Sequence, residues 1–296
     1  MNLDSYIIEH RKRVDHALQE YMPAEHTYPT IIFQAVRYSL FAGGKRIRPI
    51  LCLAATEALG GNADAVLPVA CALEMIHTYS LIHDDLPAMD NDDYRRGILT
   101  NHKIFGENIA ILAGDALLTE AFCLLSHPDH LTEFNPATRI DIIHDISDAA
   151  GFFGMIGGQV MDVQSEGKEY DMSTLQYIHS RKTGAMIAAS VRSGALLTGG
   201  KPEEINALIH YGTQIGLAFQ IADDILNVEG EEKRIGKSIG TDKKRGKATY
   251  PALVGIEASR QKGRELMTEA LSAIAPLDEK AEPLRMIARH IIERDS

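Results

Sequence analysis

The sequence predicts an all-α fold, formed by a single domain over residues 1–296 and built of roughly ten helices. Apolar residues recur at spacings of three and four along almost the whole chain, which is the period of an amphipathic helix. No segment shows the sustained alternation of apolar and polar residues that marks a β-strand. Glycine pairs and prolines stand where the helical pattern stops, as expected at helix ends.

The individual helices follow from these signals in chain order. Residues 3–22 carry Val14 and Leu18 on one apolar face, and the pattern stops before Pro23. Two shorter helices end at glycine pairs, and a longer one follows Asn62, a residue type that favours the N-cap. The tail should form shorter helices, broken near prolines 276 and 283. After the first helix, the predicted ranges are 29–42, 47–59, 62–86, 104–126, 137–155, 173–198, 203–229 and 251–296.

Composition and charge exclude several classes of protein. The chain has 41 acidic and 30 basic residues, and this net charge of −11 argues against nucleic-acid binding, which needs a basic surface. The cysteines, Cys52, Cys71 and Cys123, have neither disulfide nor metal-site spacing, which predicts buried thiols and a cytoplasmic protein. The charged N-terminus lacks an apolar signal core, and no long charge-free apolar run occurs, so we expect no signal peptide and no membrane anchor.

Five aspartates lie within residues 84–93, directly after an apolar helical stretch. Asp84 and Asp85 stand at the predicted C-terminal end of that helix, where the helix dipole disfavours negative charge. Stability alone would not place them there, whereas a bound cation would remove the conflict. Pro87 should end the helix, so that the chain can return and bring Asp90 beside Asp84. An acidic run is more often a solvated surface, and for this stretch alone that interpretation stays open.

A second polar stripe interrupts another strongly apolar helix. Gln220, Asp223, Asp224 and Asn227 are spaced to share one helical face. Adjacent carboxylates on an apolar helix repel each other and lose hydration energy on burial. Two such clusters suggest a shared divalent-metal site, and purely oxygen ligands favour Mg²⁺ or Mn²⁺ over Zn²⁺. Because Mg²⁺ is commonly bound through a few carboxylates together with substrate phosphates, phosphate chemistry is expected.

Four groups of basic residues accompany the two acidic clusters. Residues 43–49 place three cations on a glycine turn that opens a helix, an arrangement that favours anions. Arg95 and Arg96 directly follow the first acidic cluster, and their planar guanidinium groups suit diphosphate oxygens. Each group alone could be a solvated surface, but their pairing with two acidic clusters indicates a phosphate site. The remaining two groups are Lys182 with Thr183 in a helix, and Lys237 with Lys247 in a glycine-rich loop.

Two further residues are candidates on spacing alone. His77 shares a helical face with Ser80 and Asp84, so it could contact substrate, although a buried packing role is equally open. Asp162 lies on a polar stripe with Gln159, where it could support a lysine or a metal-bound water, or simply pack.

Taken in order, these motifs resemble those of the trans-prenyltransferases, the short-chain isoprenyl diphosphate synthases, over nearly the whole chain. The resemblance is closest to the bacterial farnesyl diphosphate synthases. Four residues separate Asp85 from Asp90, and the residue five positions before Asp84 is the aromatic Tyr79. The resemblance implies an isoprenoid-synthase-type bundle of about ten core helices around a central cavity, usually present as a homodimer.

The resemblance also implies a role for each motif. Three Mg²⁺ ions are expected with diphosphate bound, and the implied metal-binding residues are Asp84, Asp85, Asp90 and Asp223, with Asp224 behind them or acting through water. The residues implied to contact the allylic diphosphate are Arg95, Lys182, Gln220, Lys237 and, more weakly, Lys247. Lys182 and Thr183 would lie near the developing carbocation. The residues implied to hold isopentenyl diphosphate are Lys45, Arg48, His77 and Arg96.

The implied reaction is a Mg²⁺-dependent head-to-tail condensation of isopentenyl diphosphate with dimethylallyl and then geranyl diphosphate, which gives farnesyl diphosphate. Tyr79 and Ser80 are expected to set the product length, and the nearest competing assignment is a geranylgeranyl diphosphate synthase. Asn227 stands where the family's second motif ends in aspartate, so we expect weaker metal affinity with activity retained. A class I terpene cyclase and a non-catalytic helical binding protein also stay open.

Overall fold

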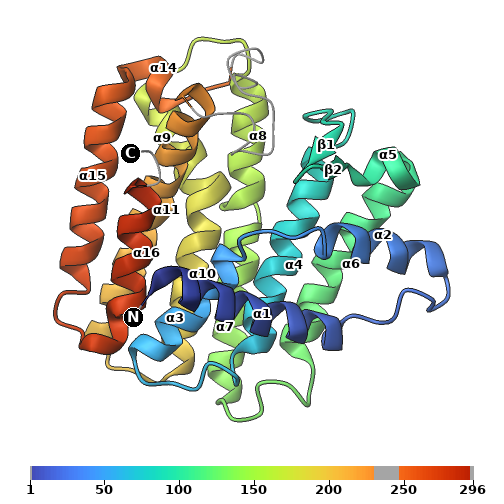
Figure 1. Ribbon diagram of the computed structural model, residues 1–296, viewed down its shortest axis with the longest axis horizontal. Helices are drawn as coiled ribbons and strands as arrows, with labels where there is room; N and C mark the ends of the chain where they lie inside the picture. The colour runs from blue at the N-terminus through green and yellow to red at the C-terminus, as the bar shows by residue number, and fades with distance from the viewer. Residues whose placement is uncertain (1, 230–246, 294–296) are drawn as a thin grey trace.

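The computed structural model, which describes residues 2–229 and 247–293, is a bundle built almost entirely of helices (Figure 1). A short hairpin of β1 (Tyr94–Arg95) and β2 (Ile98–Leu99) lies between α4 and α5. The helices of the first half are α1 (Leu3–Tyr21), α2 (Thr30–Leu40), α3 (Ile47–Ala58), α4 (Leu67–Asp84), α5 (Asn101–Phe105) and α6 (Glu107–Ser126). Those of the second half are α7 (Pro136–Ala150), α8 (Met155–Ser165), α9 (Met172–Ile178), the π-helix η1 (His179–Gly184), α10 (Ala185–Leu197), α11 (Pro202–Glu229), α14 (Tyr250–Val254), α15 (Ile256–Ala273), the 3₁₀ turn η2 (Glu279–Ala281) and α16 (Glu282–Glu293).

Helix α4 is a central helix of the bundle. Twelve of its eighteen residues are buried, so it is apolar on nearly every side, as expected of a helix surrounded by protein. It packs against α6 and α3, and its Leu73 and Ile76 belong to a core cluster with Leu117 of α6. This packing fixes the end of α4, and with it the position of the aspartates that follow.

A second core cluster joins α3, α10, α11 and α16, and helices α10, α11 and α15 run side by side (Figure 1). Tyr211 of α11 is fully buried in this cluster, and its hydroxyl donates a hydrogen bond of 2.7 Å to the carbonyl oxygen of Leu284. The burial of such side chains stabilises the fold by roughly 1.5 to 3 kcal/mol each. Helix α11, which carries the second polar stripe, is thereby held rigidly.

The all-α prediction is confirmed, and two predicted helix boundaries are wrong. Helix α4 begins at Leu67 and not at residue 62, because the Asn62 side chain accepts a hydrogen bond from Asp64 N in a short turn. Pro68 then stands in the first turn of α4, where its missing N–H costs no hydrogen bond. Pro283 breaks no helix either, since it is the second residue of α16.

Three further predicted helices differ from the structure, two by division and one by an earlier end. The predicted range 104–126 is divided at Gly106 into α5 and α6, and the range 137–155 ends at Ala150, before a separate helix α8. The predicted range 173–198 contains the π-helix η1 between α9 and α10. A π-turn inserts one extra residue per turn and often marks a functional site, and here it holds Lys182 and Thr183.

The expectation of three buried thiols is wrong for one of them. Cys52 and Cys71 are buried, but Cys123 is exposed, because the turn of α6 places it on the outer face of that helix. A cytoplasmic location therefore stays a prediction.

By length and composition, α6 is the one helix among the described residues that could cross a membrane. It packs against α4 and α2 in the core of the bundle, as apolar helices of globular proteins also do.

Candidate functional site

The first acidic cluster forms at the C-terminal end of α4. Asp84 is the last residue of the helix, and the backbone N–H of Asp90 donates a hydrogen bond of 2.8 Å to the carbonyl oxygen of Asp84. The predicted return of the chain after Pro87 is thus confirmed. Burial raises the pKa of the Asp84 carboxyl, and the neighbouring Asp90 raises it further, although Lys182 opposes both effects. The net shift is upward, so a further cation bound at this position would stabilise the carboxylate.

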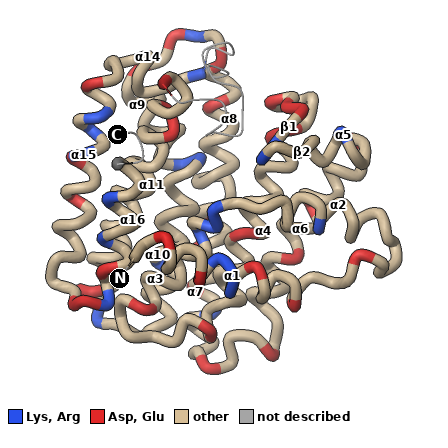
Figure 2. The backbone as a smooth tube through the Cα atoms, viewed as in Figure 1, with Lys and Arg blue, Asp and Glu red and all other residues tan. Residues whose placement is uncertain are grey.

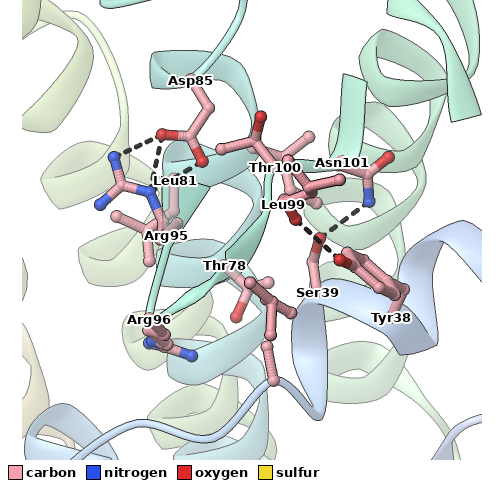
Figure 3. Close-up of a pocket in the computed structure, with 13 residues that line it drawn as sticks. Tyr38, Ser39, Thr78, Leu81, Asp85, Arg95, Arg96, Leu99, Thr100 and Asn101 are labelled. Carbon is pink, nitrogen blue, oxygen red and sulfur yellow. Dashed lines mark hydrogen bonds and ion pairs between the residues drawn. The ribbon is translucent and has the colours of Figure 1, made fainter. Parts of the chain in front are cut away.

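Asp85 is bound by the arginine that follows the acidic run. Arg95 Nε lies 2.7 Å from both carboxylate oxygens of Asp85, and one terminal guanidinium nitrogen lies 2.5 Å from Oδ1 (Figure 3). Both side chains are largely buried, and burial opposes charge on Arg95, but the bond and the attraction to Asp85 outweigh it and raise the Arg95 pKa. The pair fixes Arg95 beside the acidic cluster. Figure 2 shows this acidic segment at the same end of the bundle as the basic residues of the hairpin.

The π-helix η1 brings a lysine to the aspartates. Lys182 Nζ lies 2.6 Å from Oδ2 of Asp162 on α8, which places Asp162 beside a lysine, as one of the two sequence interpretations had it. Burial disfavours charge on Lys182, but Asp162, Asp84 and Asp90 outweigh that effect and raise its pKa. Gly158 of α8 permits the close packing, because a Cβ atom there would overlap the backbone of Lys182.

The second stripe forms a continuous hydrogen-bond chain. Thr183 Oγ1 donates to Gln220 Oε1 at 2.7 Å, and Gln220 Nε2 donates to Asp224 Oδ1 at 3.2 Å. The other oxygen of Asp224 accepts the backbone N–H of Tyr250 at 2.9 Å and lies 3.3 Å from His179 Nε2. Asp224 is buried and therefore acts as the hub that orients Gln220 and Thr183 in this structure.

The remaining residues of the two acidic clusters are placed as follows. Asp223 lies exposed on α11, next to buried Asp224. Lys247 Nζ lies 3.0 Å from Asp90 Oδ1 and 3.9 Å from Asp162, so this lysine contacts the first acidic cluster. Asn227 is half-buried on α11. Lys237 falls outside the described residues, so its predicted diphosphate contact stays a prediction.

The glycine turn at residues 43–49 is anchored by Arg46, which the sequence pattern does not distinguish from the other two cations of the turn. Arg46 is buried at the N-terminus of α3, with Nε 2.8 Å from Asp15 and Nη1 2.7 Å from buried Glu74. Its third nitrogen donates to the carbonyl oxygen of Leu40 at 2.7 Å. All three guanidinium nitrogens of Arg46 thus bond protein groups, and the residue holds the turn that presents exposed Lys45 and half-buried Arg48. The partner residues lie far away in the sequence, so no local pattern predicts this role.

A cluster of cationic groups lies beside this turn. Burial lowers the pKa of His77 well below its usual value, and the charges of Arg48 and Arg96 lower it further, so the imidazole is neutral at pH 7. The pKa values of both arginines are also lowered, first by burial, although guanidinium groups stay charged at neutral pH. Arg48 Nε is buried without a hydrogen-bond partner. Crowded positive charge with an unused buried donor is an arrangement that a bound anion would stabilise.

Arg96 reaches this cluster from the hairpin. One of its terminal nitrogens donates to the carbonyl oxygen of Gly43. Gly44 has a φ of +132°, a backbone conformation that favours glycine, and a Cβ atom there would lie 2.7 Å from the Arg96 guanidinium carbon and would displace that group. The glycines of the turn thus allow Arg96 to lie against the backbone beside Arg48 and His77.

Tyr79 and Ser80 precede the acidic cluster on α4. Tyr79 is buried, and burial together with the charge of Asp84 raises its pKa to about 12. Its ring meets the His83 ring edge to face, with centroids 5.7 Å apart. The Ser80 hydroxyl donates to the His77 carbonyl oxygen at 2.9 Å, so this side chain is turned back onto its own helix.

The donor chemistry of the acidic clusters fits Mg²⁺. Among the described residues, no three metal-ligating side chains lie close enough to form a metal-binding group on their own. Mg²⁺ usually binds through one or two carboxylates, with phosphate and water oxygens completing its shell, so a preassembled protein cage is not required. Asp84 and Asp90, whose carboxylates lie near each other, supply the oxygen ligands that this ion prefers.

Comparison with known proteins agrees with this geometry. The polyprenyl synthetase family matches residues 29–285. The chain is 50% identical to a geranylgeranyl diphosphate synthase of Cyanophora paradoxa, over 100% of this chain and 97% of the relative. It is 48% identical to a farnesyl diphosphate synthase of Geobacillus stearothermophilus, over 88% of each chain. The crystal structure of a geranylgeranyl pyrophosphate synthetase from Pyrococcus horikoshii matches 99% of this chain and 98% of its own, with a TM-score of 0.89 and 31% identity. The chain therefore belongs to the polyprenyl synthetase family, as a short-chain trans-prenyl diphosphate synthase.

Proposed function

We propose that the chain condenses isopentenyl diphosphate with dimethylallyl diphosphate and then with geranyl diphosphate, and that its main product is farnesyl diphosphate. The observation that supports this most is the presence of two differently charged subsites. Asp84, Asp90 and Lys182 form a mixed acidic and basic group, which suits a diphosphate held together with Mg²⁺. Arg48, Arg96 and neutral His77 form a cationic group, which suits a second diphosphate without metal.

In this proposal the allylic diphosphate binds at the mixed subsite. Asp84 and Asp90 would hold Mg²⁺, which neutralises the charge of the departing diphosphate when it is bound. Lys182 keeps its positive charge despite burial, and it faces the same leaving group. The lysine pairs with Asp162, which holds the ammonium group in place before substrate arrives.

The bond changes need no nucleophilic side chain. The C1–O bond of the allylic diphosphate breaks, and the electron pair leaves with diphosphate. The double bond of isopentenyl diphosphate then attacks C1, and a proton passes from the new carbocation to the departing diphosphate. Thr183, which donates its hydroxyl hydrogen to Gln220, presents its oxygen lone pairs where positive charge develops. The buried setting limits water, which would otherwise trap the carbocation.

The position of Tyr79 supports a fifteen-carbon product. It lies on α4 five residues before Asp84, buried and packed against His83, so the ring can close the space into which the hydrocarbon tail grows. Geranylgeranyl diphosphate, with twenty carbons, is the second candidate, because relatives of about equal identity carry each name.

Replacing Tyr79 with alanine tests the product assignment. We expect wild-type protein to release farnesyl diphosphate and Tyr79→Ala to release mainly products of twenty carbons or more, because the small side chain opens the floor of the tail site. Mass spectrometry of the dephosphorylated products measures both. Tyr28→Ala is the matched control, since Tyr28 is 91% exposed and belongs to neither subsite, so its replacement should leave the product unchanged. Farnesyl diphosphate as the only product of Tyr79→Ala would contradict the role of this ring.

The proposal includes a homodimer. Phe152 and Phe153 are 83% and 70% exposed, and Ile156, Val160 and Val163 continue an exposed apolar stripe along α8. A contiguous exposed apolar surface of this kind commonly marks a protein–protein interface. A second copy of the chain is the simplest partner, since most soluble oligomers are symmetric homo-oligomers.

Light scattering after size exclusion tests this assembly. We expect a particle of twice the chain mass of 32.5 kDa. The double variant Phe152→Asp/Phe153→Asp should dissociate, whereas Tyr28→Asp, at a side chain that is 91% exposed elsewhere, should not. A monomeric wild-type protein would contradict the proposed dimer.

A further inference from the structure

The hairpin that carries Arg95 and Arg96 has little structure of its own. Each strand is two residues long, with Tyr94 opposite Leu99 and Arg95 opposite Ile98. A two-stranded hairpin of this size is unstable without external support. Arg96 lies at its turn with a φ of 55°, a conformation that costs free energy for any residue except glycine. The position of Arg96 must therefore be enforced from outside the hairpin.

Arg95 and Arg96 differ in how they are held. Arg95 is fixed independently by its ion pair with Asp85 on the end of α4. The described hydrogen bond of the Arg96 side chain goes to a neutral acceptor, the carbonyl oxygen of Gly43. Movement of the hairpin should consequently shift Arg96 more than Arg95.

Two side chains tie the hairpin to helix α2. The Tyr38 hydroxyl donates a hydrogen bond of 2.7 Å to the Leu99 carbonyl oxygen, on the strand opposite the arginines. Asn101, which follows the second strand, donates from Nδ2 to the Ala35 carbonyl oxygen and to Ser39 Oγ, each at 2.8 Å. Figure 3 shows Tyr38, Ser39 and Asn101 on one side of a pocket, and Arg95 and Arg96 on the other.

The pocket beneath the hairpin makes these bonds more important. It has a volume of about 30 Å³, and Thr78 and Asn101 are among the residues that line it. Thr78 Oγ1 and Asn101 Oδ1 are buried without a hydrogen-bond partner. A close-packed core would fix the hairpin through many van der Waals contacts, and a cavity with unsatisfied polar atoms nearby supplies fewer of them. The hydrogen bonds to α2 therefore fix the hairpin where packing does not.

We infer that Tyr38 and Asn101 are positioning residues, which hold the hairpin on α2 and so set the place of Arg96 in the second diphosphate subsite. Neither side chain is required to touch substrate. The inference rests on the proposed function, in which Arg96 helps to hold isopentenyl diphosphate.

Tyr38→Phe tests the inference, because it removes only the hydroxyl that bonds Leu99. We expect KM for isopentenyl diphosphate to rise about three- to tenfold, the range that the loss of one hydrogen bond supports. The KM for dimethylallyl diphosphate and kcat should change less than about twofold, since Arg95 keeps its bond to Asp85. Tyr28→Phe, at an exposed tyrosine, is the matched control and should change none of these values. A merely structural defect would lower the melting temperature and kcat instead.

A double-mutant cycle shows whether Tyr38 acts through Arg96. In an Arg96→Gln background, Tyr38→Phe should have no further effect on KM for isopentenyl diphosphate, because the group that it positions is gone. Additive effects of the two substitutions would overturn the inference, and so would an unchanged KM in Tyr38→Phe alone.

Calorimetry, which measures the affinity for isopentenyl diphosphate, shows whether only the positioning role of Tyr38 is wrong or the proposed function is wrong as well. Wild-type protein that binds the compound, together with a Tyr38→Phe variant of equal affinity, would overturn the positioning role alone. Wild-type protein that neither binds it nor condenses it would overturn the proposed function, and the inference with it. Weaker binding by Tyr38→Phe, with wild-type affinity in Tyr28→Phe, is the result that we expect.

Discussion

Replacing Asp84 with asparagine should lower kcat by about 1,000-fold, in line with the loss of a group that stabilises charge in the transition state. The same change should raise the melting temperature of the ligand-free protein by about 1 to 3 °C. The charged carboxylate stands at the C-terminal end of α4, where the helix dipole opposes it, and burial raises its pKa. Steady-state kinetics and thermal unfolding measure the two opposite effects.

The matched control for this variant is Asp93→Asn in the same acidic run. Asp93 is exposed and pairs with Lys103 of α5 at 2.7 Å. We expect activity within about twofold of wild type and little change in stability, as is usual for exposed ion pairs. Equal losses of activity in Asp84→Asn and Asp93→Asn would show that the cluster acts only through its overall charge.

Lys182→Gln should lower kcat by about 100-fold, because in the proposed site it removes a fixed positive charge beside the leaving diphosphate. The lysine remains charged despite burial, owing to Asp162, Asp84 and Asp90, so the loss is one of electrostatics more than of packing. It also leaves Asp162, which is largely buried, without its strongest partner. Single-turnover kinetics with dimethylallyl diphosphate separate this chemical defect from a defect in product release.

Arg181→Gln is the matched control for Lys182, since the two residues are adjacent on the π-helix. Arg181 is exposed, and its guanidinium group lies 5.9 Å from the centre of the Tyr177 ring. Its removal should change kcat by less than about twofold. A loss in Arg181→Gln as large as in Lys182→Gln would mean that the π-helix as a whole, and not the ammonium group, is what matters.

Local sequence signals are sufficient to predict where helix α4 ends and how the chain continues after it. The position of Asp84 on an apolar helix and the proline three residues later predict both the helix end and the return of Asp90, and the structure shows both. The order of the motifs is also sufficient to predict the family. The helix end and the return of the chain depend on residues that are near one another in the sequence, and the order of the motifs can be read directly along the chain.

Features that depend on distant residues cannot be predicted in this way. The family resemblance implies that Asp224 lies behind the metal ligands or acts through water, but its partners Tyr250 and His179 are brought to it only by the packing of α11 against α14 and η1. From its place in the glycine turn, Arg46 is predicted to be a third cation for phosphate. In the structure it bonds Asp15 and Glu74 instead, and so anchors the turn.

Helical phase explains two more differences. The π-helix inserts extra residues per turn within the predicted range 173–198, and hydrophobic spacing does not resolve such a local change. The apolar neighbours of Cys123 predict burial, but the turn of α6 places this residue on the outer face. An apolar neighbourhood in sequence predicts a helix more reliably than it predicts which face is buried.

Product analysis of the purified wild-type chain tests the central proposal most directly. The protein is incubated with isopentenyl diphosphate and dimethylallyl diphosphate, in Mg²⁺ and in excess EDTA, and the products are sized by mass spectrometry. We expect farnesyl diphosphate as the main product with Mg²⁺ and no condensation product with EDTA. Geranylgeranyl diphosphate as the main product would contradict the proposed product length. The absence of any condensation product in Mg²⁺ would contradict the proposed reaction itself.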